Sequence, residues 1–162
     1  PASGRAPPPG TLPAVDEPYM VDGWTRIVEP LARSLGIEPG PLPRVRTRTR
    51  KAHEAAAFAR AHGAGDAMAA ALYAAYFGED RDIGRIDVLV AIGRGLGLDR
   101  SALKVALDID QYTDAVAAEQ REALRRGLRG VPAGGRADGE ALVGWRPYEE
   151  LRRWLRSDGE GE

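Results

Sequence analysis

The C-terminal part of this 162-residue chain constrains its fold most, because its structural signals come in a defined order. Gly127 is a typical residue for ending a helix, and the Val131-Pro132 step follows where a strand should begin. Residues Ala141–Trp145 predict the returning strand of a hairpin. Pro147 suits the first position of a final helix, where its missing N–H costs nothing. The sequence therefore predicts a helix, a hairpin and a second helix in series.

The composition favours a globular, helix-rich protein. Hydrophobic residues make up 43% of the chain and charged residues 29%, while aromatic residues make up only 6%. These proportions favour closely packed helices over a large sheet sandwich. The net charge of −1 gives no overall attraction to nucleic acid or anionic lipid. No apolar run reaches the roughly 20 residues of a membrane-spanning helix, so we expect no nucleic-acid partner and no membrane partner.

The spacing of apolar residues predicts a series of helices before the hairpin. We expect them at residues 22–35, 49–62, 66–77, 85–96, from 99 or 101 onward, and 111–126. Pro30 falls inside the first window, where it predicts a break or a kink. Tyr73 shares the helical spacing of Met68 and Leu72. We also expect the three tryptophans in or near the core, at positions 24, 145 and 154.

Four arginines alternate at Arg44, Arg46, Arg48 and Arg50. A strand would align them on one face, where they could bind a phosphate or a carboxylate. The other interpretation, which we favour, is a solvated connector beside acidic neighbours. No aromatic residue is interleaved with these arginines, which argues against stacking on single-stranded nucleic acid.

A set of short motifs along the chain resembles one known family. In chain order they are Thr49-x-x-Ala52-His53, Leu72-Tyr-Ala-Ala-Tyr-Phe77 with Asp82-Ile83, Gly97-Leu-Asp99, Gly130-Val-Pro132 and Gly144-Trp-x-Pro-Tyr148. Together they resemble the DsbA-like thioredoxin superfamily. Within it, the sequence is most similar to the FrnE-type oxidoreductases and the related 2-hydroxychromene-2-carboxylate isomerases. The resemblance covers about residues 22–156.

This resemblance implies an α-rich α/β protein with a thioredoxin-like fold and a large all-helical insertion. Residues 1–21 would form a proline-rich arm or linker, 22–110 the helical insertion, 111–156 the C-terminal thioredoxin half, and 157–162 an acidic tail. The family's N-terminal strand and active-site helix are missing or degenerate in this sequence. The glycine-rich stretch 133–139 also departs from the hydrophobic strand that usually follows the proline, because glycine offers no side chain to pack.

The resemblance places a substrate-binding site at Gly130, Val131 and Pro132. In such families the Val131-Pro132 bond would be cis and would face the active site. The main-chain N–H and C=O at this step could then pair with an extended peptide or with glutathione. The alternative is an ordinary trans Val-Pro bond in a loop.

The sequence contains no cysteine, so none of its residues can act as a thiol nucleophile or bind a metal through a thiolate. We predict no catalytic residue and no metal site within it. The resemblance implies a DsbA-family thiol–disulfide oxidoreductase-like protein whose redox cysteines are absent from this chain. The alternatives are a glutathione-dependent isomerase-like protein, with glutathione as cofactor, and a non-catalytic, degenerate thioredoxin-fold binding domain.

The expected partners are a peptide or thiol/disulfide substrate, and glutathione in the alternative. A sheet that lacks its first strand exposes an edge, so we also expect either marginal stability or a homodimer. Pro1–Pro13 contain no secretory leader pattern, and we expect a cytoplasmic protein.

Overall fold

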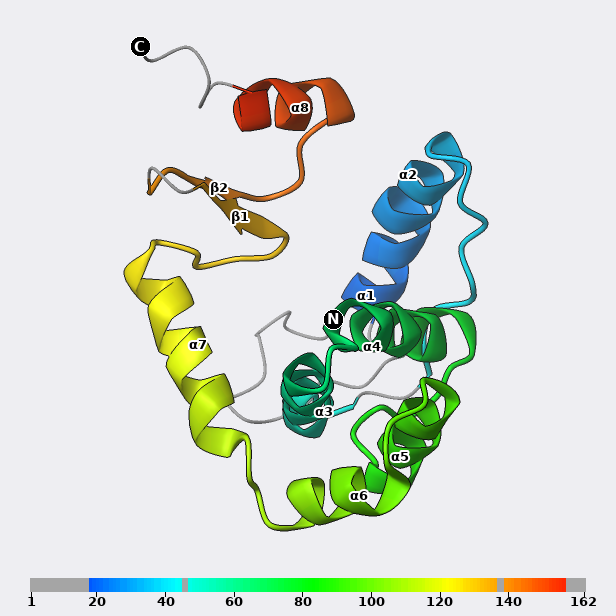
Figure 1. Ribbon diagram of the computed structural model, residues 1–162. Helices are drawn as coiled ribbons and strands as arrows, with labels where there is room; N and C mark the ends of the chain where they lie inside the picture. Colours follow the sequence, from blue (N-terminus) through cyan, green and yellow to red (C-terminus); the bar gives the residue numbers. More distant parts are fainter. Residues whose placement is uncertain (1–17, 45–46, 137–138, 157–162) are drawn as a thin grey trace. The chain divides into compact units, whose positions relative to one another are not determined.

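A computed structural model describes residues 18–44, 47–136 and 139–156 (Figure 1). The chain divides into two compact units, Pro1–Thr113 and Asp114–Glu162. We call them the helical unit and the hairpin unit, and we describe each by itself.

The helical unit begins with a helical segment that passes through a proline. Helix α1 (Pro18–Gly23) continues into a π-helical turn, η1 (Trp24–Val28), and then into α2 (Glu29–Ser34). The N–H of Glu29 donates to the carbonyl of Trp24, five residues back. Pro30 has no N–H, and its ring would collide with the carbonyl four residues back in a regular α-helix. The wider turn accommodates the proline, so the predicted break at Pro30 is instead a π-turn within a continuous helix.

Four helices and a second π-turn form the body of this unit. They are α3 (Arg50–Ala61), α4 (Gly65–Tyr73) with η2 (Ala74–Gly78), α5 (Ile86–Gly95) and α6 (Arg100–Asp108). Helix α6 begins at an N-cap, because the Asp99 carboxylate accepts the Ala102 N–H at 2.6 Å. The predicted helices in this region are confirmed to within a few residues at each end.

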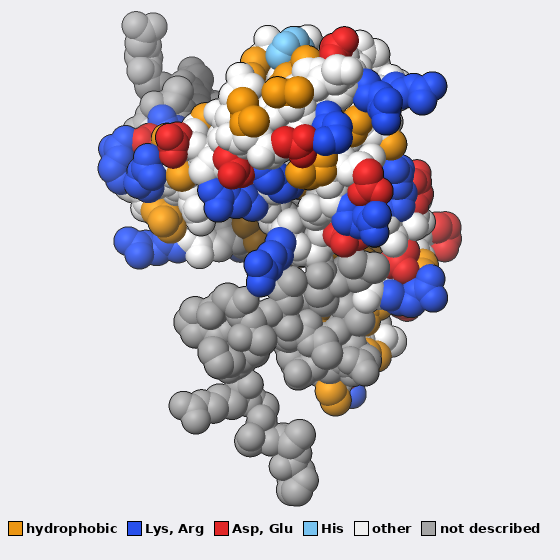
Figure 2. Space-filling model, turned by 90° about the horizontal axis from the view of Figure 1, so that it is seen from below, with side chains coloured by type: hydrophobic (Ala, Val, Ile, Leu, Met, Phe, Trp, Pro, Cys, Tyr) orange, Lys and Arg blue, Asp and Glu red, His pale blue; other side chains and the backbone are white. Residues whose placement is uncertain are grey.

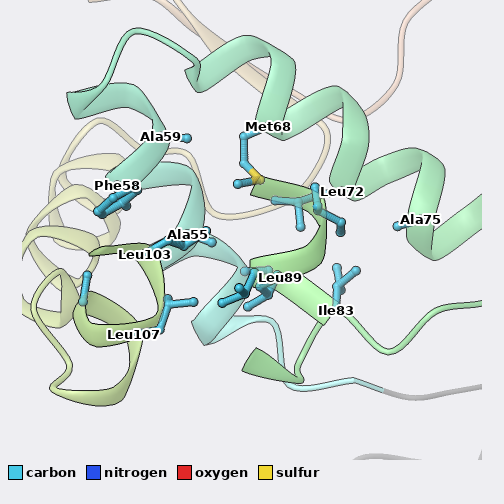
Figure 3. Packing of buried hydrophobic residues seen from close by; sticks show 14 residues of the cluster. Ala55, Phe58, Ala59, Met68, Leu72, Ala75, Ile83, Leu89, Leu103 and Leu107 are labelled. Carbon is cyan, nitrogen blue, oxygen red and sulfur yellow. The ribbon is translucent and has the colours of Figure 1, made fainter. Parts of the chain in front are cut away.

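In the core of the helical unit, large apolar side chains pack against small ones. Figure 3 shows leucines of α5 and α6 pointing toward the alanine-rich face of α3. Leu89, Leu103 and Met68 are fully buried. Gly93 on α5 packs so closely against Leu103 that an added Cβ would collide with that side chain. The alanines and this glycine let the helices approach, so the larger side chains fill the remaining space.

One buried carboxylate connects α3 to the start of α7. Glu54 is fully buried and accepts hydrogen bonds from the Lys51 ammonium at 2.7 Å and the Thr113 hydroxyl at 2.9 Å. Lys51 also donates to the Asp110 carboxylate at 2.7 Å. Burial acts to lower the pKa of Lys51, but its hydrogen bonds to Asp110 and Glu54 outweigh this, and the pKa is raised. The hydrogen bond from Lys51, and then its charge, lower the pKa of Asp110.

The hairpin unit contains a two-stranded antiparallel sheet between helices. Helix α7 (Thr113–Arg125) leads to β1 (Ala133–Gly135), β2 (Ala141–Val143) and α8 (Tyr148–Arg156). In the register, Ala133 pairs with Val143 and Gly135 with Ala141. The first three residues of the glycine-rich stretch therefore do form a strand. None of the described residues of this unit is buried.

Arg136 links α8 to the hairpin through contacts with Trp154. Its guanidinium donates to the Trp154 carbonyl at 2.7 Å and lies 5.4 Å from the centre of the Trp154 ring. It also forms an ion pair with Glu140. These contacts satisfy a carbonyl in the last turn of the helix and add a cation–π interaction.

Trp145 is 50% exposed, so the expectation that it lies in or near the core was wrong. Tyr73, which shares the helical spacing of Met68 and Leu72, is 68% exposed. Trp24 and Trp154 are half-buried. In the hairpin unit the cause is the lack of an opposing apolar layer, while Tyr73 lies off the face that buries Met68 and Leu72.

Of the arginines at 44–50, the described ones, Arg44, Arg48 and Arg50, do not lie in a strand. Arg44 pairs with Asp80 at 2.8 Å, and Arg50 starts α3 and lies 3.5 Å from the Glu54 carboxylate. Arg46 lies outside the described residues. Among the described residues, none of the helices is long and apolar enough to cross a lipid bilayer.

Candidate substrate-binding site

The predicted site residues Gly130, Val131 and Pro132 lie in the segment that leads into β1. The Val131–Pro132 peptide bond is cis. The Gly144 N–H donates to the Pro132 carbonyl at 2.8 Å, which joins the segment to the residue that follows β2. Gly130 lies beside β2, since a Cβ added to it would be 3.2 Å from Val143 Cγ1. The segment is thus held to the hairpin on both sides of Val131.

Val131 itself is free of such contacts. Its residue surface is 93% exposed, and within the described residues its backbone makes no hydrogen bond. The N–H and C=O of one residue are therefore presented to solvent from a segment that its neighbours hold in place. This arrangement can pair with a short stretch of extended peptide, as strand addition does on a larger scale.

A groove of about 500 Å³ lies beside this segment, between the hairpin and α8. Pro132 lines one end, and Arg146 is the charged residue of the lining. Its apolar side chains are Leu142, Trp145, Leu151, Trp154 and Leu155. The groove lies within the hairpin unit, and its volume is in the range of small-ligand sites.

The sequence pattern singled out Gly130, Val131 and Pro132 as a predicted site but did not indicate the groove. The three residues are contiguous, so a short motif could point to them. The groove needs the pairing of β1 with β2 and the placement of α8, and its apolar residues were assigned to packing. The amphipathic spacing of Leu151, Trp154 and Leu155 was the available signal.

The described residues around this segment offer backbone groups and apolar side chains. The chain has no cysteine, and no group of three or more His, Asp or Glu side chains gathers for a metal ion among the described residues. Of the two histidines, His62 stacks on Phe58 with ring centres 4.1 Å apart. The geometry thus offers a backbone pair and an apolar groove, without a nucleophile.

Comparison with known proteins places this geometry in a family. The chain is 32% identical over 124 residues to the uncharacterized protein YwbO of Bacillus subtilis (strain 168), covering 75% of this chain and 59% of that protein. Its structure resembles the crystal structure of a probable DsbA oxidoreductase from Streptomyces coelicolor, with a TM-score of 0.78 and 25% identity. That match covers 89% of this chain and 62% of the other. The chain thus spans about six tenths of the length of these relatives.

A family model also matches most of the chain. Residues 19–156 match the family described as the DSBA-like thioredoxin domain, which includes α1, the helices of the core, the hairpin and α8. The thioredoxin-like, helix-rich fold expected from the motifs agrees with both the family match and the structural neighbour. The chain belongs to the DSBA-like thioredoxin domain family.

Proposed function

We propose that this chain is the peptide-presenting part of a DsbA-like thiol–disulfide oxidoreductase. The observation that carries the proposal is Val131, whose backbone is exposed and unpaired while Pro132 and Gly130 are held against the hairpin. Family membership supports the class of reaction. In this proposal a disulfide or thiol peptide lies along Gly130–Pro132, and its neighbouring apolar side chain enters the groove beside Trp145.

The residues of this chain hold the substrate and do not perform the exchange. Thiol–disulfide exchange needs a thiolate that attacks a disulfide sulfur, and the chain has no cysteine. We therefore expect no turnover in a dithiol–disulfide exchange assay with this chain alone. Robust turnover by these 162 residues would contradict the proposed division of roles.

The binding role is tested by removing one backbone donor. Val131→Pro deletes the N–H of residue 131, whereas Val131→Ala keeps it and changes only an exposed side chain. The probe is reduced and alkylated insulin B chain, an extended polypeptide that cannot exchange disulfides. Binding is followed by NMR at residues 130–132 and 142–155. We expect Val131→Ala to bind like the unchanged chain and Val131→Pro to bind about tenfold more weakly.

The same titration separates the alternatives. Shifts at Gly130–Pro132 with glutathione, and none with the B chain, would favour the glutathione-dependent isomerase-like protein over the oxidoreductase. A folded chain that responds to neither probe would favour a degenerate domain that binds neither thiols nor peptides. Equal B-chain affinity of the two Val131 variants would overturn the role given to the Val131 N–H.

We also propose that two copies of the chain associate through the hairpin. Both outer edges of a two-stranded sheet are open to further pairing, and Val143 and Trp145 beside them are exposed. Sedimentation over a wide concentration range should show a dimer that Trp145→Lys dissociates. A monomer at all concentrations would contradict this association.

A further inference from the structure

A second groove lies in the helical unit, away from the Val131 segment in the sequence. Helices α5 and α6 form a helical hairpin joined by residues 96–99, and a groove of about 510 Å³ runs between them. Ile86, Val90 and Arg94 line it from α5 at a spacing of four residues. Arg100, Lys104 and Asp108 line it from α6 at the same spacing. Each helix therefore presents one continuous stripe of side chains to the groove.

The two ends of this groove differ in charge. At the end away from the connection, Asp87 pairs with Arg85 at 2.9 Å, and Asp108 pairs with Lys104. At the connection end, Arg94 lies in the last turn of α5 and Arg100 is the first residue of α6. Neither of these two guanidinium groups forms an ion pair with any residue that the structure describes. Two guanidinium groups without an ion pair among the described residues thus share one end of the groove, beside the Asp99 carboxylate that caps α6.

An anion at this end would be stabilised by both arginines. Planar guanidinium groups bind carboxylate and phosphate oxygens through paired hydrogen bonds. The start of α6 at the same end is already capped by the Asp99 carboxylate, which accepts the Ala102 N–H at 2.6 Å, so the two guanidinium groups carry the anion recognition. Like charges without a counter-ion repel each other, so an anion would relieve this repulsion in addition to its own hydrogen bonds.

The α5 side of the groove wall contributes three apolar residues, whereas Asp87, Lys104 and Asp108 are charged. Val90 is buried, Ile86 is half-buried, and Ala91 is exposed beside them. Figure 2 views the molecule from the side where α5 and α6 lie in Figure 1, and it shows basic, acidic and apolar side chains interspersed. A mixed surface of this kind offers no continuous basic track for a polyanion. The charge pattern favours a small ligand with one anionic end.

We propose that the α5–α6 groove binds an amphiphilic carboxylate, with its carboxylate on Arg94 and Arg100 and its hydrocarbon chain along Ile86, Val90 and Ala91. The arginines supply the charge recognition, and the apolar wall supplies the preference for a chain. This site is independent of the proposed function at Val131.

Octanoate is the test ligand, with acetate and inorganic phosphate as comparisons. The full chain is titrated with each, and binding is followed by NMR shifts of residues 86–108. We expect octanoate to shift this region at concentrations where acetate and phosphate do not. The double variant Arg94→Gln/Arg100→Gln should weaken octanoate binding at least about tenfold.

The matched control removes the same charge elsewhere. Arg26 and Arg33 lie on α1–η1–α2, each in an ion pair on the helix surface. Arg26→Gln/Arg33→Gln should leave octanoate affinity unchanged. An equal loss in both double variants would reduce the effect to net charge and overturn the proposal.

A single surface substitution provides a second test that does not depend on removing the arginines. Ala91→Glu places a carboxylate one helical turn before Arg94 on an exposed position. It should compete with the ligand and abolish octanoate binding while the helices stay folded by circular dichroism. Undiminished binding to Ala91→Glu, or phosphate binding as tightly as octanoate, would reject the proposed ligand class.

Discussion

The helical unit and the hairpin unit use similar amphipathic patterns with different results. In the helical unit, buried apolar residues come from α3, α4, η2, α5 and α6 and form one cluster. In the hairpin unit none of the described residues is buried, although α8 has a clear apolar face. Leu155 on that face is 58% exposed. An amphipathic pattern therefore shows which face an element can bury, and says nothing about whether an opposing layer is present.

The largest contrast should come from truncating one leucine in each unit. Leu103 is fully buried in the helical unit, whereas Leu142 on β2 is half-buried beside an open groove. Leu103→Ala should lower the free energy of unfolding by about 2–5 kcal/mol, because it leaves a cavity among helices. Leu142→Ala should cost less than about 1 kcal/mol. Urea denaturation measures both, and similar losses would show that the hairpin unit has a comparable core.

The next contrast compares two glycines of helix α5. Gly93 faces Leu103, with Leu98 and Met68 each 3.5 Å from an added Cβ, while Gly95 has nothing within 4 Å. Gly93→Ala should destabilise the protein by about 1–3 kcal/mol through overpacking. Gly95→Ala should stabilise it by roughly 0.5 kcal/mol through helix propensity. Thermal unfolding that moves in the same direction for both would contradict the tight packing of α5 on α6.

A smaller change in the stability of the folded state depends on pH and on the Lys51–Asp110 contact. The pKa of Asp110 is lowered by the hydrogen bond from Lys51, so its charged form stabilises the folded state above the pKa of the unfolded chain. This contribution is lost as the pH falls through the lower, folded-state pKa. Asp110→Asn should therefore reduce stability at pH 7 and make little difference at about pH 2.

The substitution keeps the local backbone possible, because Asp110 has a φ of 58° and asparagine tolerates this conformation. Urea denaturation at the two pH values checks the prediction. A loss of equal size at both would assign the effect to the backbone turn and not to the charge.

The smallest change in the free energy of unfolding is expected from removing the Arg136 contacts that hold α8 against the hairpin. Arg136→Met removes the hydrogen bond to the Trp154 carbonyl and the contact with its ring. We expect faster hydrogen exchange in β1, β2 and α8, and a change of less than about 0.5 kcal/mol in the unfolding of the helical unit. Arg129→Met, an exposed arginine before the hairpin, is the control. Faster exchange in α3 or α5 would show that the two units unfold together.

The sequence predicted the local elements well and the distant contacts poorly. The windows 49–62 and 85–96 correspond to α3 and α5, because their apolar spacing and end signals are local. The site at Gly130, Val131 and Pro132 also rests on contiguous residues, and it stays a prediction. The Lys51–Asp110 and Thr113–Glu54 hydrogen bonds join residues 59 apart in the sequence, and no short motif encodes them. The exposure of Trp145 depends on what packs against it, which its own sequence neighbours do not specify.

The π-turns of the helical unit bear on how the length of this chain can vary. A π-turn holds one more residue than an α-turn between the same hydrogen-bonded ends. Removing one residue from Trp24–Val28 or Ala74–Gly78 would convert the wide turn to a regular one. At Ala74–Gly78 the helix axis would then continue with less disruption than a deletion within α3 or α5 would cause. In the first segment, Pro30 would oppose the change, because it would again face a carbonyl four residues back. Relatives one residue shorter should therefore have their gap at 74–78, and relatives without this proline should also tolerate one at 24–28.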